Sequence, residues 1–122
     1  GLDTAVADKL MADLEAKLPT LNGKIYNGYT VSEAAPFVYN DPVDHSSTQN
    51  GLIVKFADGS RIVYRLSGTG SSGATLRVYL EKYEQNKLDE DPQKMLQPIL
   101  EIAMDIAEIT SRTGKQHADV IT

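Results

Sequence analysis

The beginning of the chain carries the hydrophobic pattern of an α-helix. Its apolar residues recur every four positions, at Val6, Leu10, Leu14 and Leu18. Residues four apart share one face of a helix, and charged residues fill the positions between them, so the pattern predicts an amphipathic helix. Asp3 or Thr4 would cap its start. Pro19 would end it, because a proline disfavours helical backbone in the residue before it.

Residues 22–50 carry a weaker pattern. Lys24–Tyr29 and Phe37–Tyr39 are short β-rich runs, which we expect to form strands. Residues 40–42 and 44–50 are rich in Asn, Asp, Ser and Pro, which favour turns. This part of the chain therefore predicts two short strands, separated and followed by turns.

A clearer β signal begins at Leu52. Leu52–Phe56 and Arg61–Leu66 are β-rich runs joined by Asp58-Gly59, a hairpin turn in which glycine accepts positive φ without steric cost. Ala74–Tyr83 then alternates apolar and polar residues with a period of two. That period predicts a half-buried strand.

A second helix is predicted near the end of the chain. Asp91 would be its N-cap, Pro92 its first residue and Gly114 its C-cap. Its apolar stripe consists of Met95, Ile99, Ile102, Ile106 and Ile109. Pro98 should kink this helix or shift its start. The sum is an α+β fold: an antiparallel sheet of about four strands with two helices packed on one face, in a single domain over residues 1–122.

Composition narrows the classes of function. A chain of 122 residues, 41% hydrophobic and 24% charged, is typical of one folded domain. It has no cysteine, which excludes disulfides and is compatible with the cytoplasmic location that we expect. The net charge of −5 argues against nucleic-acid binding. No apolar run reaches the roughly 20 residues that span a membrane, and no signal peptide is recognisable at Gly1–Thr4.

A Gly- and Ser-rich loop with an arginine on each side carries the candidate chemistry. Its glycines allow backbone N–H groups to converge on an anion, and its hydroxyls can donate further hydrogen bonds. Arginine presents parallel donors that match phosphate oxygens. None of these groups serves as a proton-transfer base near neutral pH, so we predict a phosphate-binding site without catalytic residues. The candidate residues are Arg65, Ser67, Gly68, Thr69, Gly70, Ser71 and Arg77.

Two other interpretations of this loop were weighed. One is a plain turn between strands, which Gly and Ser clusters often form. The other is a nucleotide site, because residues 68–73 match the dinucleotide fingerprint G-x-G-x-x-G. That fingerprint needs a helix after its third glycine, whereas a strand is predicted here, and a Walker A loop would need a following Gly-Lys-Ser/Thr. The two flanking arginines favour the phosphate site over the plain turn.

The run from Phe56 to Arg77 closely resembles the last domain of the α-phosphoglucomutases of the phosphohexomutase superfamily. The likeness extends over nearly the whole chain, at Tyr39–Asp44, Tyr83-Glu84, Asp91–Gln93, Met95-Leu96, Arg112–Gly114 and Val120–Thr122. The resemblance implies a fold like that of the TATA-box-binding protein. It also implies that Arg65, Ser67, Thr69 and Arg77 contact a substrate phosphate, with Gly68, Gly70 and Ser71 shaping or donating to the same loop.

The resemblance further implies a function. The family interconverts glucose 1-phosphate and glucose 6-phosphate through glucose 1,6-bisphosphate. A phosphoserine in its first domain transfers the phosphoryl group, a Mg²⁺ ion in the second assists, and the third reads sugar hydroxyls. The fourth domain grips the phosphate that is not transferred and rotates to close the cleft. The expected partners are therefore phosphorylated hexoses and the other domains of the same enzyme.

The remaining parts of such an active site are missing from the sequence. It contains neither a Thr-x-Ser-His-like nucleophile segment nor an Asp-Gly-Asp-x-Asp metal loop. Asp89–Asp91 is interpreted as a solvated helix start, and His45 and His117 as exposed bystanders. We therefore predict no metal or cofactor in this domain and no activity of the chain alone, whereas the parent enzyme would use Mg²⁺ and glucose 1,6-bisphosphate.

Two hypotheses remain open at this point. The chain is either a domain taken from a larger mutase or a free-standing phosphosugar-binding or interaction module. Its start within a helix, without an obvious Met, favours the first hypothesis.

Overall fold

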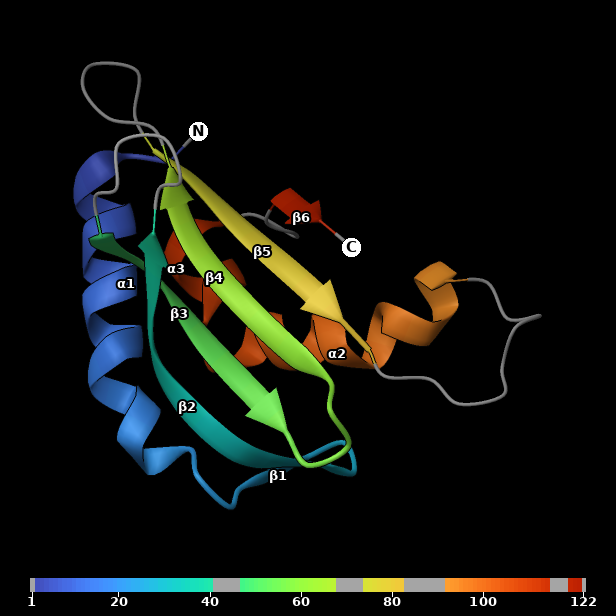
Figure 1. Cartoon of the computed structure of the whole chain (residues 1–122). Coiled ribbons are helices and arrows are strands. Elements are labelled where there is room, and N and C mark those ends of the chain that lie inside the picture. Colours follow the sequence, from blue (N-terminus) through green and yellow to red (C-terminus); the bar gives the residue numbers. More distant parts are fainter. Residues whose placement is uncertain (1, 41–46, 68–73, 83–91, 115–118, 122) are drawn as a thin grey trace.

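A computed structural model of the chain describes residues 2–40, 47–67, 74–82, 92–114 and 119–121. The elements are drawn in Figure 1. In chain order they are α1 (Thr4–Lys17), the 3₁₀ helix η1 (Leu18–Thr20), β1 (Ile25–Tyr26), β2 (Tyr29–Asn40), β3 (Ser47–Phe56), β4 (Arg61–Ser67), β5 (Thr75–Glu81), α2 (Pro92–Ile106), α3 (Ile109–Thr113) and β6 (Asp119–Ile121).

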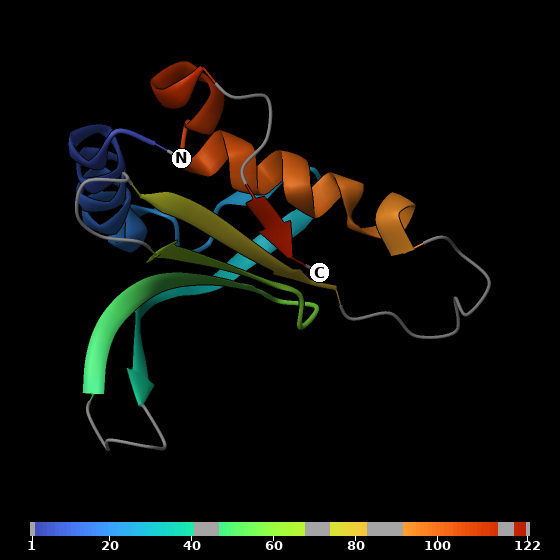
Figure 2. The same cartoon turned by 90° about the horizontal axis from the view of Figure 1, so that it is seen from above.

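The described strands form one sheet in the order β1-β2-β3-β4-β5-β6. All neighbouring pairs are antiparallel except β5 and β6, which are parallel. Figure 2 shows α1, α2 and α3 on one side of this sheet. The predicted α+β architecture is thus confirmed, with more strands than the expected four. β1, of two residues, lies within the expected run Lys24–Tyr29, whereas the three-residue β6 was not predicted.

The core lies between the helices and the inner face of the sheet. Alternation along β4 and β5 sends every second side chain inward, and the helices supply aliphatic side chains against them. Fully buried members of this core include Ile62, Tyr64, Val78, Leu10, Leu14, Ile99 and Ile102. At its centre the Tyr64 hydroxyl donates a hydrogen bond to the Ala103 carbonyl at 2.7 Å.

The first helix forms as its pattern predicts. The Asp3 carboxylate caps it by accepting a 2.8 Å hydrogen bond from the Ala5 N–H group. The helix ends at Lys17, and Pro19 falls in the 3₁₀ turn that follows. Val6, which the pattern places on the apolar face, lies at the edge of that face and is 37% exposed. Ala7 is buried instead.

The β3–β4 turn is confirmed. Gly59 has φ +95°, the region that favours glycine. The Asp58 carboxylate accepts a 2.8 Å hydrogen bond from the Ser60 N–H group, and the Phe56 N–H group donates to the Ser60 carbonyl. Asp58 and Gly59 therefore hold the two strands in register.

The predictions for residues 22–50 were wrong in extent. The expected strand Lys24–Tyr29 is interrupted by Asn27 and Gly28, whose positive φ angles form a tight hairpin turn. The short strand expected at residues 37–39 is part of the twelve-residue β2. Residues 47–50, expected as a turn, begin β3, because backbone pairing with β2 holds them extended.

The last helix is broken where a continuous one was predicted. It begins at Pro92 as expected, so Pro98 lies within it without moving its start. It ends at Ile106, and Glu108 adopts a left-handed conformation with φ +54° before α3 begins. Gly114, with φ +73°, caps α3 as predicted. The expected cap Asp91 lies outside the described residues.

Replacing Tyr64 tests how much its hydrogen bond to Ala103, which joins the sheet to α2, contributes to stability. Burial raises the pKa of Tyr64 far above its usual value, so its hydroxyl stays a donor. We expect Tyr64→Phe to lower the free energy of unfolding by about 1 to 2 kcal/mol, because the Ala103 carbonyl loses its side-chain partner. Urea unfolding measures this change. Tyr79→Phe, on the opposite face of the sheet, should change stability by less than about 0.5 kcal/mol, and equal effects would contradict the assignment.

Candidate phosphate-binding site

The two predicted arginines meet in the structure. Arg65 on β4 and Arg77 on β5 are directly opposite in the antiparallel ladder. Directly opposed residues project from the same face of a sheet, with Cβ atoms about 5 Å apart. Their chain neighbours Tyr64 and Val78 are fully buried toward the helices. Both arginines therefore lie on the face that the helices leave open.

The charge pattern of this open face is uneven. Four residues farther along the same strands, Arg61 faces Glu81 and forms an ion pair of 2.7 Å. Farther across the sheet, Lys55 pairs with Glu33 at 3.6 Å. Like charges directly opposite each other are destabilising in a sheet. The two opposed arginines repel each other, and an anion bound between them would reduce that repulsion.

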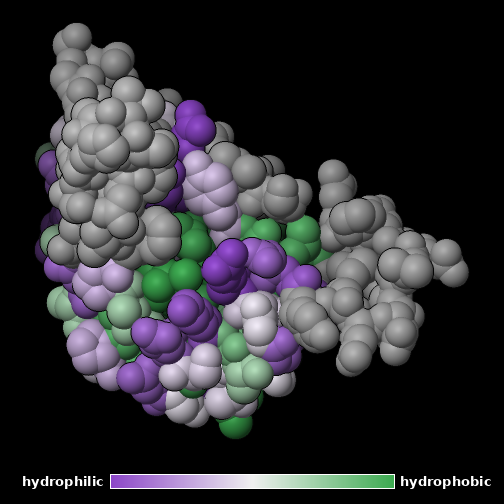
Figure 3. Space-filling model, in the orientation of Figure 1, coloured by the Kyte–Doolittle hydropathy of each residue, from purple (hydrophilic) through white to green (hydrophobic). Residues whose placement is uncertain are grey.

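Small residues lie next to the arginine pair. Gly51 on β3 is directly opposite Arg65, so the position beside that arginine has no side chain. Thr75 lies on the same face as Arg77, two residues earlier. Arg77 is exposed and Arg65 is half-buried, with further interactions of its own within the chain. Figure 3 shows this face, on which hydrophilic residues border a central hydrophobic group.

The other predicted phosphate contacts are described in part or not at all. Ser67 is the last residue of β4 and pairs with Thr75. Gly68, Thr69, Gly70 and Ser71 lie outside the described residues, and so do His45, His117 and Asp89–Asp91. Within the described ranges, no group of three or more His, Asp or Glu side chains is arranged to hold a metal ion. None of the described helices is long and apolar enough to cross a membrane.

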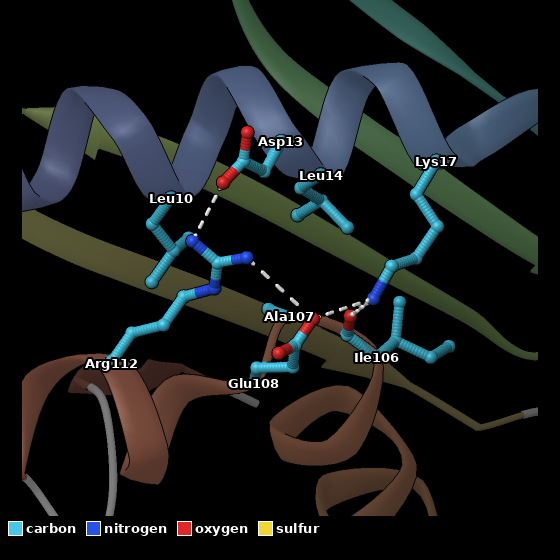
Figure 4. A pocket seen from close by; sticks show the side chains of 8 residues that line it. All are labelled: Leu10, Asp13, Leu14, Lys17, Ile106, Ala107, Glu108 and Arg112. Carbon is cyan, nitrogen blue, oxygen red and sulfur yellow. Dashed lines mark hydrogen bonds and ion pairs between the residues drawn. The ribbon is translucent and has the colours of Figure 1, made fainter.

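A second charged cluster joins α1 to the break between α2 and α3. Arg112 forms an ion pair of 2.7 Å with Asp13, and its other nitrogen lies 3.7 Å from Glu108. Lys17 donates to Glu108 at 3.0 Å and to the Ile106 carbonyl at 2.8 Å. Figure 4 shows these side chains around a cavity of about 10 Å³, which is roughly the space of one water molecule.

This second cluster is structural. The hydrogen bond from Arg112 lowers the pKa of Asp13, and the hydrogen bond from Lys17 lowers the pKa of Glu108. With Lys9, which pairs with Asp13 at 3.3 Å, three cations face two carboxylates that they already bind. Lys17 also satisfies a carbonyl at the end of α2, where a helix favours a cation. Sequence reasoning missed the cluster because its residues are about 90 positions apart.

A larger hollow lies elsewhere in the described part of the chain. It has a volume of about 470 Å³ and is bordered by Asn27 and residues of α2 and α3. Glu101 and Asp105 line it. Two carboxylates repel a phosphate, so the arginine pair is the better candidate for an anion.

Comparison with known proteins places these observations in a family. A family model described as "Phosphoglucomutase-1, C-terminal domain" matches residues 1–119. Phosphoglucomutase-1 of Oryctolagus cuniculus is 47% identical over 125 residues, covering 95% of this chain and 22% of that protein. Phosphoglucomutase of Schizosaccharomyces pombe is 47% identical over 121 residues, covering 97% of this chain and 20% of that protein.

A solved structure is similar as well. It is the open form of pp63/parafusin, a phosphoglucomutase from Paramecium, with a TM-score of 0.76 and 38% identity. The match covers 99% of this chain and 21% of that structure. The chain therefore spans about a fifth of the length of the relatives that it matches.

The second cluster predicts a pH dependence of stability. Because the pKa values of Asp13 and Glu108 are lowered in the folded state, their contribution is present above the unfolded values, about 4 to 4.5. It is lost as the pH falls through the folded values. We expect Arg112→Met to destabilise the chain more at pH 7 than at about pH 3, as measured by urea unfolding.

The control for this experiment removes a positive charge elsewhere. Lys24→Met, in the loop before β1, should change stability similarly at both pH values. A difference between wild type and Arg112→Met that stays constant from neutral to acid pH would contradict the assignment.

Proposed function

Because the chain belongs to the family of phosphoglucomutase-1 C-terminal domains, we propose that it is the substrate-phosphate-binding domain of a phosphoglucomutase. The parent enzyme would interconvert glucose 1-phosphate and glucose 6-phosphate. The observation that carries the proposal is the opposed pair Arg65 and Arg77 on the open face of the sheet. In the proposed role, this pair binds the phosphate group that is not being transferred.

The chemistry of the pair suits a sugar phosphate. Each guanidinium offers several N–H donors in a plane and keeps its charge at every physiological pH. Two guanidinium groups side by side can neutralise a phosphate dianion with charge-assisted hydrogen bonds. Ser67, Gly68, Thr69, Gly70 and Ser71 would add hydroxyl and backbone donors where the chain passes from β4 to β5.

The domain would contribute binding energy rather than chemistry. Phosphoryl transfer depends mainly on alignment and charge stabilisation, so a grip on the distant phosphate can orient the sugar without touching the reacting atoms. Closing the domain over the substrate would also exclude water from the phosphoenzyme. Other domains of the parent enzyme would supply the phosphoserine and the ligands of Mg²⁺.

The arginine pair can be tested by titrating the chain with glucose 6-phosphate and following backbone amide shifts by NMR. We expect Arg77→Met and Arg65→Met each to weaken binding about tenfold or more, because a charge-assisted hydrogen bond is lost. Arg77→Lys should recover part of the affinity by keeping the charge without the planar fork. Arg61→Met is the matched control, since Arg61 lies on the same strand and face but pairs with Glu81. Equal titrations for Arg77→Met and Arg61→Met would refute the site.

The proposed division of labour predicts that the chain alone is inactive. In a coupled assay with Mg²⁺, glucose 1-phosphate and glucose 1,6-bisphosphate, the 122 residues should form no glucose 6-phosphate above background. Metal-dependent conversion by the purified chain would show that it contains a complete active site.

A further inference from the structure

The segment before α1 is hydrogen-bonded to the strand that carries Arg77. The Leu2 N–H group donates to the Ala74 carbonyl at 2.6 Å, and the Ala74 N–H group donates to the Leu2 carbonyl at 2.9 Å. These reciprocal bonds make an antiparallel bridge outside the named strands. Figure 1 shows the N-terminal end of the chain beside the start of β5.

The bridge connects two well-anchored parts of the molecule. Leu2 packs against the core, and the next residue, Asp3, caps α1. On the other side, Ala74 is 2% exposed and directly precedes β5. Arg77 follows three residues later. The start of β5 is thus tied to α1 as well as to β4.

The start of β5 is where such a tie matters. The β4–β5 ladder ends at the pair Ser67 and Thr75, and the ends of a ladder open more readily than its centre. Arg77 is only two pairs from this end. A binding constellation must be held to within about 0.5 Å, which requires support from groups that do not touch the ligand.

We propose that Leu2 is a positioning residue for phosphate binding: through its backbone N–H and C=O groups it holds Ala74, and so keeps Arg77 opposite Arg65. This inference rests on the proposed function of the arginine pair. Thermodynamic linkage adds a second consequence. If the bridge increases the affinity for phosphate, then bound phosphate stabilises the bridge by the same free energy. The segment before α1 and the phosphate site are therefore energetically coupled.

The experiment uses the 122-residue chain and two readouts. Leu2→Pro removes the N–H donor of the bridge, whereas Leu2→Ala shortens the side chain and keeps the donor. Asp3→Ala removes the cap of α1, one residue away, and keeps the bridge. Ala74→Pro breaks the same bridge from its other side. Affinity for glucose 6-phosphate is measured by amide shifts, amide hydrogen exchange is followed along β5, and urea unfolding reports global stability.

We expect Leu2→Pro and Ala74→Pro to weaken binding about fivefold or more, at the lower end of typical couplings between sites. Amide exchange should become faster at the start of β5 while β3 keeps its protection. Leu2→Ala and Asp3→Ala should bind as the wild type does even where they lower stability. In the wild type, glucose 6-phosphate should slow the exchange of the Leu2 amide.

The possible failures are distinguishable. If the wild type binds and Leu2→Pro binds equally well, the positioning role is refuted and the arginine site stands. If Asp3→Ala weakens binding as much as Leu2→Pro does, loss of stability explains the effect and the inference is refuted. If the wild type does not bind glucose 6-phosphate at all, the proposed function fails, and the positioning role fails with it.

Discussion

The antiparallel register of β4 and β5 is the constraint on which the rest of the structure depends. It places Tyr64 opposite Val78 toward the helices and Arg65 opposite Arg77 toward the open face. Because side chains alternate along a strand, a slip of one residue would expose the tyrosine and bury the arginines. The hydrophobic core and the candidate site are thus fixed by the same set of backbone hydrogen bonds, and neither can shift without the other.

This shared register explains how the sheet tolerates two opposed cations. Arg61 and Glu81 show the ordinary solution on the same two strands, an ion pair across the ladder. Arg65 and Arg77 instead place two cations opposite each other, over an inner face of fully buried side chains and the hydrogen bond from Tyr64 to Ala103. A local cost offset by its surroundings is typical of a functional site. In this acidic chain, it concentrates positive charge at one place on the sheet.

The sequence alone was sufficient for the parts of the fold that local patterns determine. The β-rich composition of β4, the period of two in β5, the helical stripe of α1 and the Asp58-Gly59 turn follow from neighbouring residues. The end of α2 does not, because Lys17 reaches its last carbonyl from the far end of the chain. The position of Gly51 beside Arg65 could not be predicted for the same reason, because the sequence of a strand does not show its register with another strand.

The position of the arginines also bears on the proposed role of this domain in phosphoryl transfer. Binding energy gained at a part of the substrate that does not react can be used to orient the part that does. Such a contribution depends on rigid placement of the donors. A loosely held arginine must be ordered when the ligand binds, and the lost conformational entropy reduces the binding free energy. Arg77 is paired with Arg65 on β4 and with Asp119 on β6, and the bridge from Leu2 holds the start of its own strand. Segments from both ends of the described chain therefore converge on β5, the strand that carries Arg77.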